Sequence, residues 1–144
     1  MDLDDALLDD ADALLAADSR QLLPMTASAG ASIRAAAAMV TPQAIDRVVD
    51  DGRPHAVVVV GGGGSRAAGD ILAAVAGSGS PVPVMTFGGP SLPGWVGPTD
   101  VVVAVSGSGR TPETLEVSAE AARRGCRLVV VAPERSPLTH LADQ

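Results

Sequence analysis

The stretch "VVVAVSGSGRTPETLE", residues 101–116, decides the fold of this chain. Its first five residues, VVVAV, are apolar and mostly β-branched, which predicts a buried strand. Residues 112–125, "PETLEVSAEAARRG", begin with a proline and end with a glycine, as a helix between two turns does. A strand followed directly by a helix is one repeat of an α/β layered fold.

The same alternation recurs on both sides of this stretch. Residues 55–77, "HAVVVVGGGGSRAAGDILAAVAG", predict a strand, a glycine turn and a helix. Residues 82–87, "VPVMTF", and 127–133, "RLVVVAP", predict two more strands, and residues 88–99 form a Gly/Pro loop. Because strands alternate with helices, we predict a three-layer αβα sandwich with a parallel sheet, of the flavodoxin-like kind.

The residues before this alternation predict helices. Leucines recur at helical spacing between Asp2 and Ala17, a second helix is expected from about Thr26 to Met39 after the break at Pro24, and a third from Thr41 to Gly52. We therefore divide the chain into N-terminal helices, residues 1–52, which pack on an α/β domain, residues 53–144.

The fourth and last predicted strand of the sheet, residues 127–133, lies near the end of the sequence. Ser136-Pro137 starts a further helix, which stops at Gln144 after barely two turns. A sheet at this stage normally continues, so we expect the chain to be a truncated piece of a longer protein.

Composition narrows the class of protein. The chain has 144 residues, enough for one domain, and a net charge of −7. An acidic chain without a basic cluster or an aromatic platform is a poor nucleic-acid binder, and no apolar run reaches membrane-spanning length. All basic side chains except two histidines are arginines, so a P-loop lysine is excluded. A single cysteine, Cys126, and an acidic N-terminus lead us to expect a cytoplasmic protein.

The most informative segment is residues 106–111, which we call the hydroxyl loop. It carries the hydroxyls of Ser106, Ser108 and Thr111, with glycines at 107 and 109 that let a ligand approach the backbone. The loop leaves a predicted strand at the carboxyl edge of the sheet and opens a helix, whose N-terminus attracts anions. We predict a phosphate site here. Thr111 is also explained as an ordinary helix N-cap, and serines are common in loops.

A second glycine-rich segment, residues 61–65, follows the first predicted strand, and we call it the glycine loop. Gly62, Gly64 and Ala67 fit the G-x-G-x-x-A dinucleotide pattern, but the second strand ends in Gly88-Gly89 and not in the acidic residue that holds a ribose. We favour the alternative that Gly64 and Ser65 form a second wall of the same phosphate site.

These two loops together resemble the sugar-isomerase (SIS) family. "SGSGRTPET" is similar to the phosphosugar motif Ser-x-Ser-Gly-x-Thr-x-Glu-Thr, and "GGGGSRAAGD" resembles the corresponding stretch of bifunctional phosphoglucose/phosphomannose isomerases. The resemblance implies that Ser65, Ser106, Ser108 and Thr111 bind a sugar phosphate, with Gly64, Gly107, Gly109 and Arg110 lining the site. Gly107, Arg110 and Pro112 depart from the usual pattern.

The resemblance also implies an activity. Such a chain would be the SIS domain of an aldose–ketose isomerase acting on glucose 6-phosphate or mannose 6-phosphate and fructose 6-phosphate, with the catalytic half after residue 144. SIS domains commonly pair, so a homodimer is expected. The alternative is a non-catalytic sugar-phosphate sensor. No cofactor is implied.

Candidate catalytic groups are few, and we assign none. His55 precedes the first strand at the edge away from the loops, and His140 lies near the end of the sequence. Glu113, in the first turn of the predicted helix, either orients the loop or a ligand or is a capping or solvated residue, and we favour capping or solvation. We interpret three other glutamates as surface charges: Glu116, Glu120 and Glu134. Two distant histidines and one cysteine do not make a metal site, and Cys126 is interpreted as a buried structural thiol.

Overall fold

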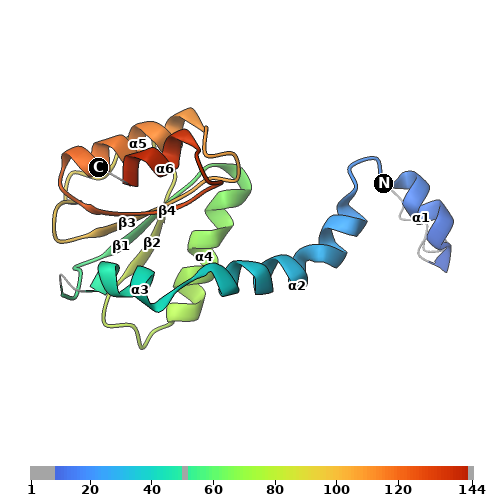
Figure 1. Ribbon diagram of the computed structural model, residues 1–144, viewed down its shortest axis with the longest axis horizontal. Helices are drawn as coiled ribbons and strands as arrows, with labels where there is room; N and C mark the ends of the chain where they lie inside the picture. Colours follow the sequence, from blue (N-terminus) through green and yellow to red (C-terminus); the bar gives the residue numbers. More distant parts are fainter. Residues whose placement is uncertain (1–8, 50–51, 143–144) are drawn as a thin grey trace. The chain divides into compact units, whose positions relative to one another are not determined.

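The computed structural model describes residues 9–49 and 52–142 (Figure 1). The chain forms two compact units, Met1–Ile45 and Asp46–Gln144. The packing of the predicted N-terminal helices on the α/β domain stays a prediction.

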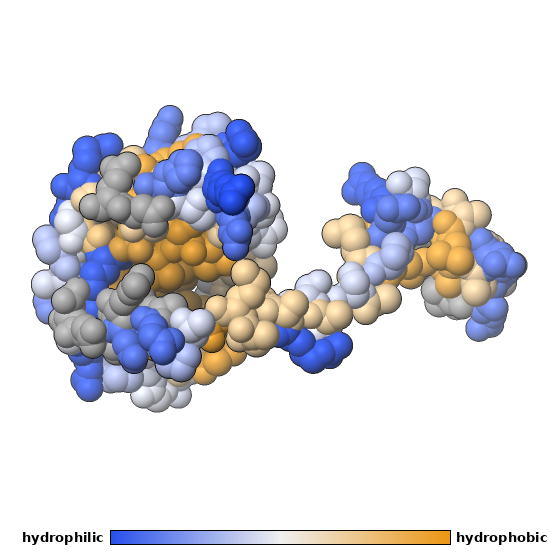
Figure 2. Space-filling model, viewed as in Figure 1, coloured by the Kyte–Doolittle hydropathy of each residue, from blue (hydrophilic) through white to orange (hydrophobic). Residues whose placement is uncertain are grey.

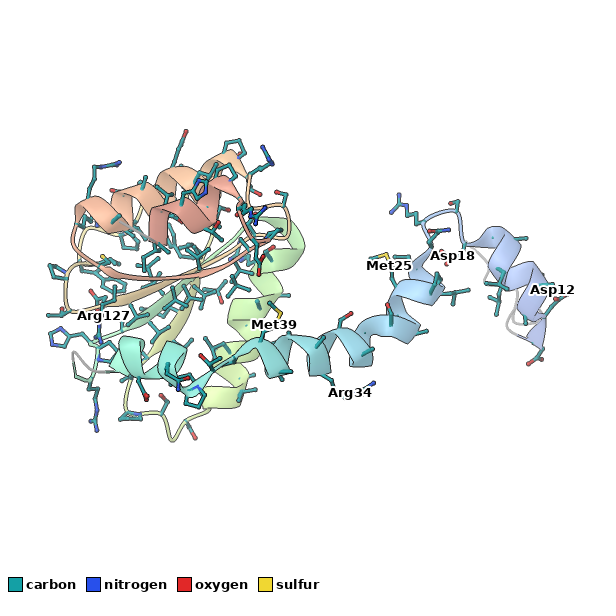
Figure 3. All side chains as sticks on the ribbon, in the orientation of Figure 1. Asp12, Asp18, Met25, Arg34, Met39 and Arg127 are labelled. Carbon is teal, nitrogen blue, oxygen red and sulfur yellow. The ribbon has the colours of Figure 1, made fainter. Side chains whose placement is uncertain are left out.

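The first unit holds helices α1 (Ala11–Ala17) and α2 (Leu22–Met39). Asp10 caps α1, since its Oδ1 accepts hydrogen bonds from the N–H groups of Asp12 and Ala13. Asp18 lies in the connection (Figure 3), and its carboxylate accepts from the first two N–H groups of α2 at 2.8 Å each. The predicted break at Pro24 is wrong, because α2 includes it. A proline in the first turn of a helix costs no intrahelical hydrogen bond.

The predicted continuous helix from Asp2 to Ala17 is also wrong, because α1 begins at Ala11, after the extended backbone of its N-cap Asp10. The expected start at Asp2 lies outside the described residues. Helix α3 (Pro42–Val49) begins at the proline that follows Thr41, as predicted, and ends before the expected Gly52. No helix in the described part of the chain is long and apolar enough to cross a membrane.

The second unit contains a four-stranded parallel sheet. Its strands are β1 (Val57–Val60), β2 (Val84–Phe87), β3 (Val101–Val105) and β4 (Arg127–Val131), in the order β2-β1-β3-β4. Val58 of β1 is in register with Met85 of β2 and with Val102 of β3. All four predicted strands are confirmed.

Helices cover both faces of this sheet (Figure 1). The turn η2 (Gly63–Ser65) and helix α4 (Arg66–Ala76) connect β1 to β2, and α5 (Pro112–Arg123) connects β3 to β4, followed by α6 (Pro137–Ala142). The two connections move outward in opposite directions from the centre of the sheet. Right-handed crossovers therefore place α4 on one face and α5 on the other, which confirms the αβα sandwich. The crevice at the carboxyl ends of β1 and β3 is where such folds bind ligands.

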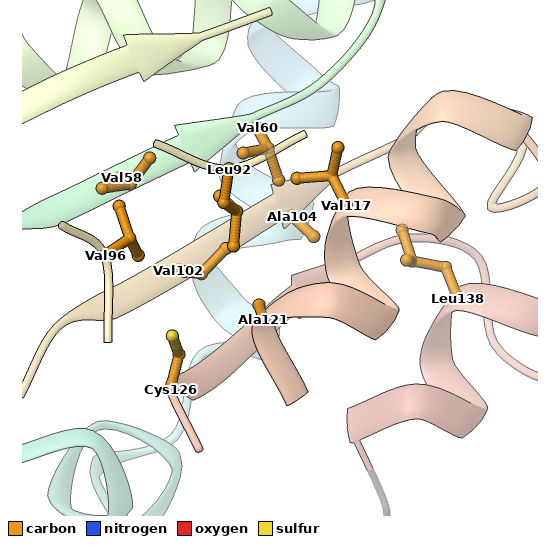
Figure 4. Packing of buried hydrophobic residues seen from close by; sticks show 10 residues of the cluster. All are labelled: Val58, Val60, Leu92, Val96, Val102, Ala104, Val117, Ala121, Cys126 and Leu138. Atoms are coloured by element: carbon orange, nitrogen blue, oxygen red, sulfur yellow. The ribbon is translucent and has the colours of Figure 1, made fainter. Parts of the chain in front are cut away.

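The main core lies between the sheet and α5 (Figure 4). Valine and alanine side chains of β1 and β3 meet Val117 and Ala121 of α5, and Leu138 of α6 closes one side. Leu92 and Val96 come from the Gly/Pro loop. Figure 2 shows apolar residues gathered in the middle of this unit, with hydrophilic residues around its rim.

Glu120 is not the free surface charge that the sequence predicts. Its Oε2 accepts a hydrogen bond from the N–H of Leu92 at 2.9 Å, and its Oε1 lies 2.7 Å from an Arg124 nitrogen. Arg124 also donates to the carbonyls of Pro93 and Val96 at 2.7 and 3.1 Å. The pair therefore ties the Gly/Pro loop to α5.

Candidate functional site

Three loops meet at the carboxyl edge of the sheet, as the parallel topology requires. The glycine loop follows β1, residues 88–89 follow β2, and the hydroxyl loop follows β3. The strand order brings the glycine loop between the other two.

Ser106 closes the hydroxyl loop on itself. The residue is only 3% exposed. Its Oγ lies 3.1 Å from the Thr111 hydroxyl and accepts a hydrogen bond from the N–H of Gly109 at 3.0 Å. Its N–H donates to the carbonyl of Val131 at the end of β4. The Ser106 hydroxyl thus connects the two ends of the loop, at Gly109 and Thr111.

Thr111 stands at the N-cap position of α5 but does not cap the helix with its side chain. Its backbone is extended, and its side chain makes no hydrogen bond to the first turn of α5. The hydroxyl bonds to Ser106 instead. Our explanation of Thr111 as an ordinary cap is therefore wrong. Helix α5 begins at Pro112. No capping side chain accepts from the backbone N–H groups of its first turn, so they can donate hydrogen bonds to a ligand.

The outer part of the hydroxyl loop faces solvent. Gly107, Ser108 and Arg110 are exposed, and the Ser108 Oγ accepts a hydrogen bond from the N–H of Arg110 at 3.2 Å. These residues are open to a ligand from solution.

The glycine loop packs against the hydroxyl loop. A Cβ on Gly61 would lie 2.8 Å from the carbonyl oxygen of Val105, and one on Gly62 would lie 3.5 Å from the Thr111 methyl group. Gly64 is exposed, and Ser65 is half-buried in η2. The two loops thus lie side by side as predicted, while their binding of a ligand stays a prediction.

A cavity of about 140 Å³ opens beside these loops. None of the residues predicted to bind phosphate lines it directly. Its walls come from the ends of β1 and β2, the glycine loop and the start of α5, and they comprise Val60, Gly61, Gly62, Phe87, Gly88, Gly89, Glu113, Thr114 and Val117.

Phe87 lines the cavity and was not considered in the sequence analysis, whereas Glu113 was considered as a residue that orients a ligand but was favoured as capping or solvated. Glu113, interpreted as capping or solvated, lies on the cavity wall in the first turn of α5. Phe87 ends β2, and a Cβ on Gly89 would lie 2.5 Å from its ring. Because β2 ends at the same edge as β3, the parallel topology could have indicated residues 87–89.

The motif residues Gly69 and Asp70 have structural roles. A Cβ on Gly69 would lie 2.6 Å from the Thr86 hydroxyl and 2.9 Å from the Val59 Cβ, so the glycine lets α4 approach the sheet closely. The Thr86 hydroxyl donates to the Asp70 carboxylate at 2.7 Å.

The remaining titratable candidates lie apart from the loops or are buried. His55 precedes β1, where its Nδ1 lies 3.2 Å from the Thr99 hydroxyl, and His140 is exposed on α6. Cys126 is 8% exposed, and burial raises the pKa of its thiol, which confirms the structural interpretation. Among residues 9–49 and 52–142, no group of three or more His, Cys, Asp or Glu is placed to hold a metal ion.

Comparison with solved structures identifies the fold. The sugar isomerase domain of an RpiR transcription factor from Sphaerobacter thermophilus matches with a TM-score of 0.68 at 22% identity, over 88% of this chain and 74% of that one. NanR of Vibrio vulnificus, complexed with ManNAc-6P, matches with a TM-score of 0.64 at 23% identity, over 90% and 52%. A proposed phosphosugar isomerase from Silicibacter pomeroyi DSS-3 matches with a TM-score of 0.56 at 26% identity, over 69% and 31%.

This chain therefore has the fold of the SIS domain, as the two loops predicted. It spans only 29–32% of the length of three phosphosugar isomerases of proposed function that it matches. No protein-family model and no curated protein matches the sequence. The more specific resemblance to bifunctional phosphoglucose/phosphomannose isomerases stays a prediction from the sequence.

Proposed function

We propose that this chain binds a sugar phosphate at the carboxyl edge of its sheet. We further propose that it is the SIS domain of an aldose–ketose isomerase acting on glucose 6-phosphate or mannose 6-phosphate and fructose 6-phosphate. One observation carries the proposal. The glycine loop and the hydroxyl loop lie next to the N-terminus of α5, which no side chain caps, and all three lie beside one cavity.

The phosphate would be held mainly by neutral donors. Ser108 presents an exposed hydroxyl, and Ser106 and Thr111 share one hydrogen bond that a phosphate oxygen can join. The first turn of α5 adds backbone N–H groups and the positive end of the helix dipole. The sugar would then extend into the cavity, beside Phe87.

Isomerisation also needs a base that moves a proton between neighbouring carbons. In the described part of the chain, Glu113 is the one carboxylate on the cavity wall. The family resemblance implies that the catalytic groups follow residue 144, so we propose that this chain contributes binding and that Glu113 orients the ligand.

Thermal unfolding with and without glucose 6-phosphate tests the binding. A ligand that binds only the folded state raises the melting midpoint. When the free ligand concentration is a hundred times Kd, the free energy of unfolding rises by about 2.7 kcal/mol. We expect a shift with glucose 6-phosphate and none with glucose. Ser108→Ala should reduce the shift, whereas Ser78→Ala, an exposed serine in the turn after α4, should leave it unchanged. Equal shifts with glucose, or no shift in a cooperative melt, would contradict the proposal.

A non-catalytic sensor is the second candidate function. The sugar isomerase domain of the RpiR factor and NanR match 88–90% of this chain, a larger share than the proposed isomerase from Silicibacter pomeroyi matches. A chain extended beyond residue 144 separates the two functions. Conversion of fructose 6-phosphate to glucose 6-phosphate supports the isomerase, and binding without conversion supports the sensor. We also propose that copies pair as a homodimer, which sedimentation equilibrium tests directly.

A further inference from the structure

Arg66 extends from the glycine loop to the end of β2. It is the first residue of α4 and follows Ser65 directly. Its guanidinium lies against Gly88, where a Cβ would be 2.9 Å from Nη1 and 3.4 Å from Cζ. Gly88 lines the cavity, and Arg66, which is exposed and does not itself line the cavity, lies against that wall residue. Any larger residue at position 88 would displace the guanidinium.

This guanidinium has no partner among the residues that the structure describes. It forms neither an ion pair nor a hydrogen bond with them, although the chain carries 17 acidic residues. Glu113 lines the cavity as well but does not pair with Arg66. An arginine presents a planar set of donors that matches a carboxylate or a phosphate. Arg66 therefore places a positive charge without a protein partner beside Gly88, a residue of the cavity wall.

The guanidinium of Arg66 and the hydroxyl loop lie at the ends of different strands. Gly88 follows β2 and Ser106 follows β3, and β1 lies between these strands. Two strand spacings correspond to about 10 Å. A phosphate on the hydroxyl loop would leave the other end of a six-carbon sugar near Arg66.

We infer that Arg66 is a second anion-binding residue of this site, and that the ligand carries an acidic group at the end opposite its phosphate. This inference rests on the proposed phosphate binding at the hydroxyl loop. The ligand class it defines is a sugar phosphate with a further carboxylate or a second phosphate.

Two ligands with the same carbon skeleton test the inference by titration calorimetry. 6-Phosphogluconate has a carboxylate at C1, and glucose 6-phosphate has an uncharged group there. The wild-type chain should bind 6-phosphogluconate about tenfold more tightly, because a bidentate pair with arginine is charge-assisted. Arg66→Gln should remove this preference without changing the affinity for glucose 6-phosphate. Arg123→Gln, on the exposed end of α5, should alter neither affinity.

The outcomes separate the two proposals. Loss of affinity for both ligands in Arg66→Gln would show that Arg66 holds the phosphate itself and would overturn the inference. Equal wild-type affinities for the two ligands would also overturn it, while leaving phosphate binding intact. Binding of neither ligand by the folded wild-type chain would overturn the proposed function and the inference with it.

Discussion

A methyl group on Gly109 would collide with the side chain of Ser136, the residue that precedes α6. Gly109 also has a φ of +62°, in the left-handed region that favours glycine. Its carbonyl accepts a hydrogen bond from the N–H of Leu138 at 3.2 Å. The hydroxyl loop is therefore packed against the start of α6, and its shape depends on that contact.

Gly109→Ala should destabilise the α/β unit by about 2–4 kcal/mol, from the left-handed conformation and the overlap with Ser136. Urea unfolding followed by circular dichroism measures this loss. Gly107→Ala is the matched control in the same loop, since a Cβ there meets nothing within 4 Å and its φ is not positive. Equal stability of the two variants would contradict the packing described for Gly109.

Gly69→Ala should destabilise the chain by about 1–2 kcal/mol, although alanine is the better helix former. The added methyl would press on Thr86 and Val59 and move α4 away from the sheet. Gly30→Ala in α2 is the control, because a Cβ there makes an ordinary contact at 3.5 Å with Arg34. Thermal unfolding should show a lower midpoint only for Gly69→Ala, and a raised midpoint there would refute the close approach of α4.

Glu120 should make stability depend on pH in the acidic range. The hydrogen bond from the Leu92 N–H, and then Arg124, lower the pKa of Glu120 from its usual 4.5. A carboxyl whose pKa is lower in the folded state stabilises the protein above the unfolded value, and this contribution disappears as the pH falls through the folded value. Glu120→Gln should therefore destabilise most at neutral pH, and its difference from wild type should shrink towards pH 3.

Urea titrations at several pH values measure that difference. Glu116→Gln, an exposed residue on the same helix, serves as the control and should differ little from wild type at every pH. A difference for Glu120→Gln that stays constant from pH 7 to pH 3 would argue against the ionic bridge to the Gly/Pro loop.

Cys126 should react slowly with iodoacetamide in the folded chain. The thiolate is the reactive form, and burial followed by the nearby Asp100 raises the pKa of this thiol. We expect alkylation at pH 8 to accelerate by more than about tenfold in urea, where the thiol is exposed. Cys126→Ala with Ala122→Cys moves the thiol to an exposed position on α5 and should react rapidly without urea. Rapid alkylation of the native wild type would show that Cys126 is accessible.

Much of the architecture could be predicted because its signals are local. Four short valine-rich runs, each bounded by Gly, Pro or polar turns, define the strands, and Pro112 marks the start of α5. The extent of α2 was misjudged because Pro24 breaks a helix interior but is tolerated in a first turn. Glu120 was misjudged because its partners Leu92 and Arg124 include one that is 28 residues away.

The sequence by itself determined the parallel α/β class, the position of the hydroxyl loop and the glycine loop after their strands, and the SIS resemblance, since each depends on residues that are neighbours along the chain. Only the tertiary structure decided what the side chains of those loops contact. It paired the Thr111 hydroxyl with Ser106 instead of the helix, put Glu113 on the cavity wall and laid Arg66 against Gly88. The physical reason is the strand order: β2-β1-β3 brings together loops separated by tens of residues, and no local pattern encodes which side chains then meet.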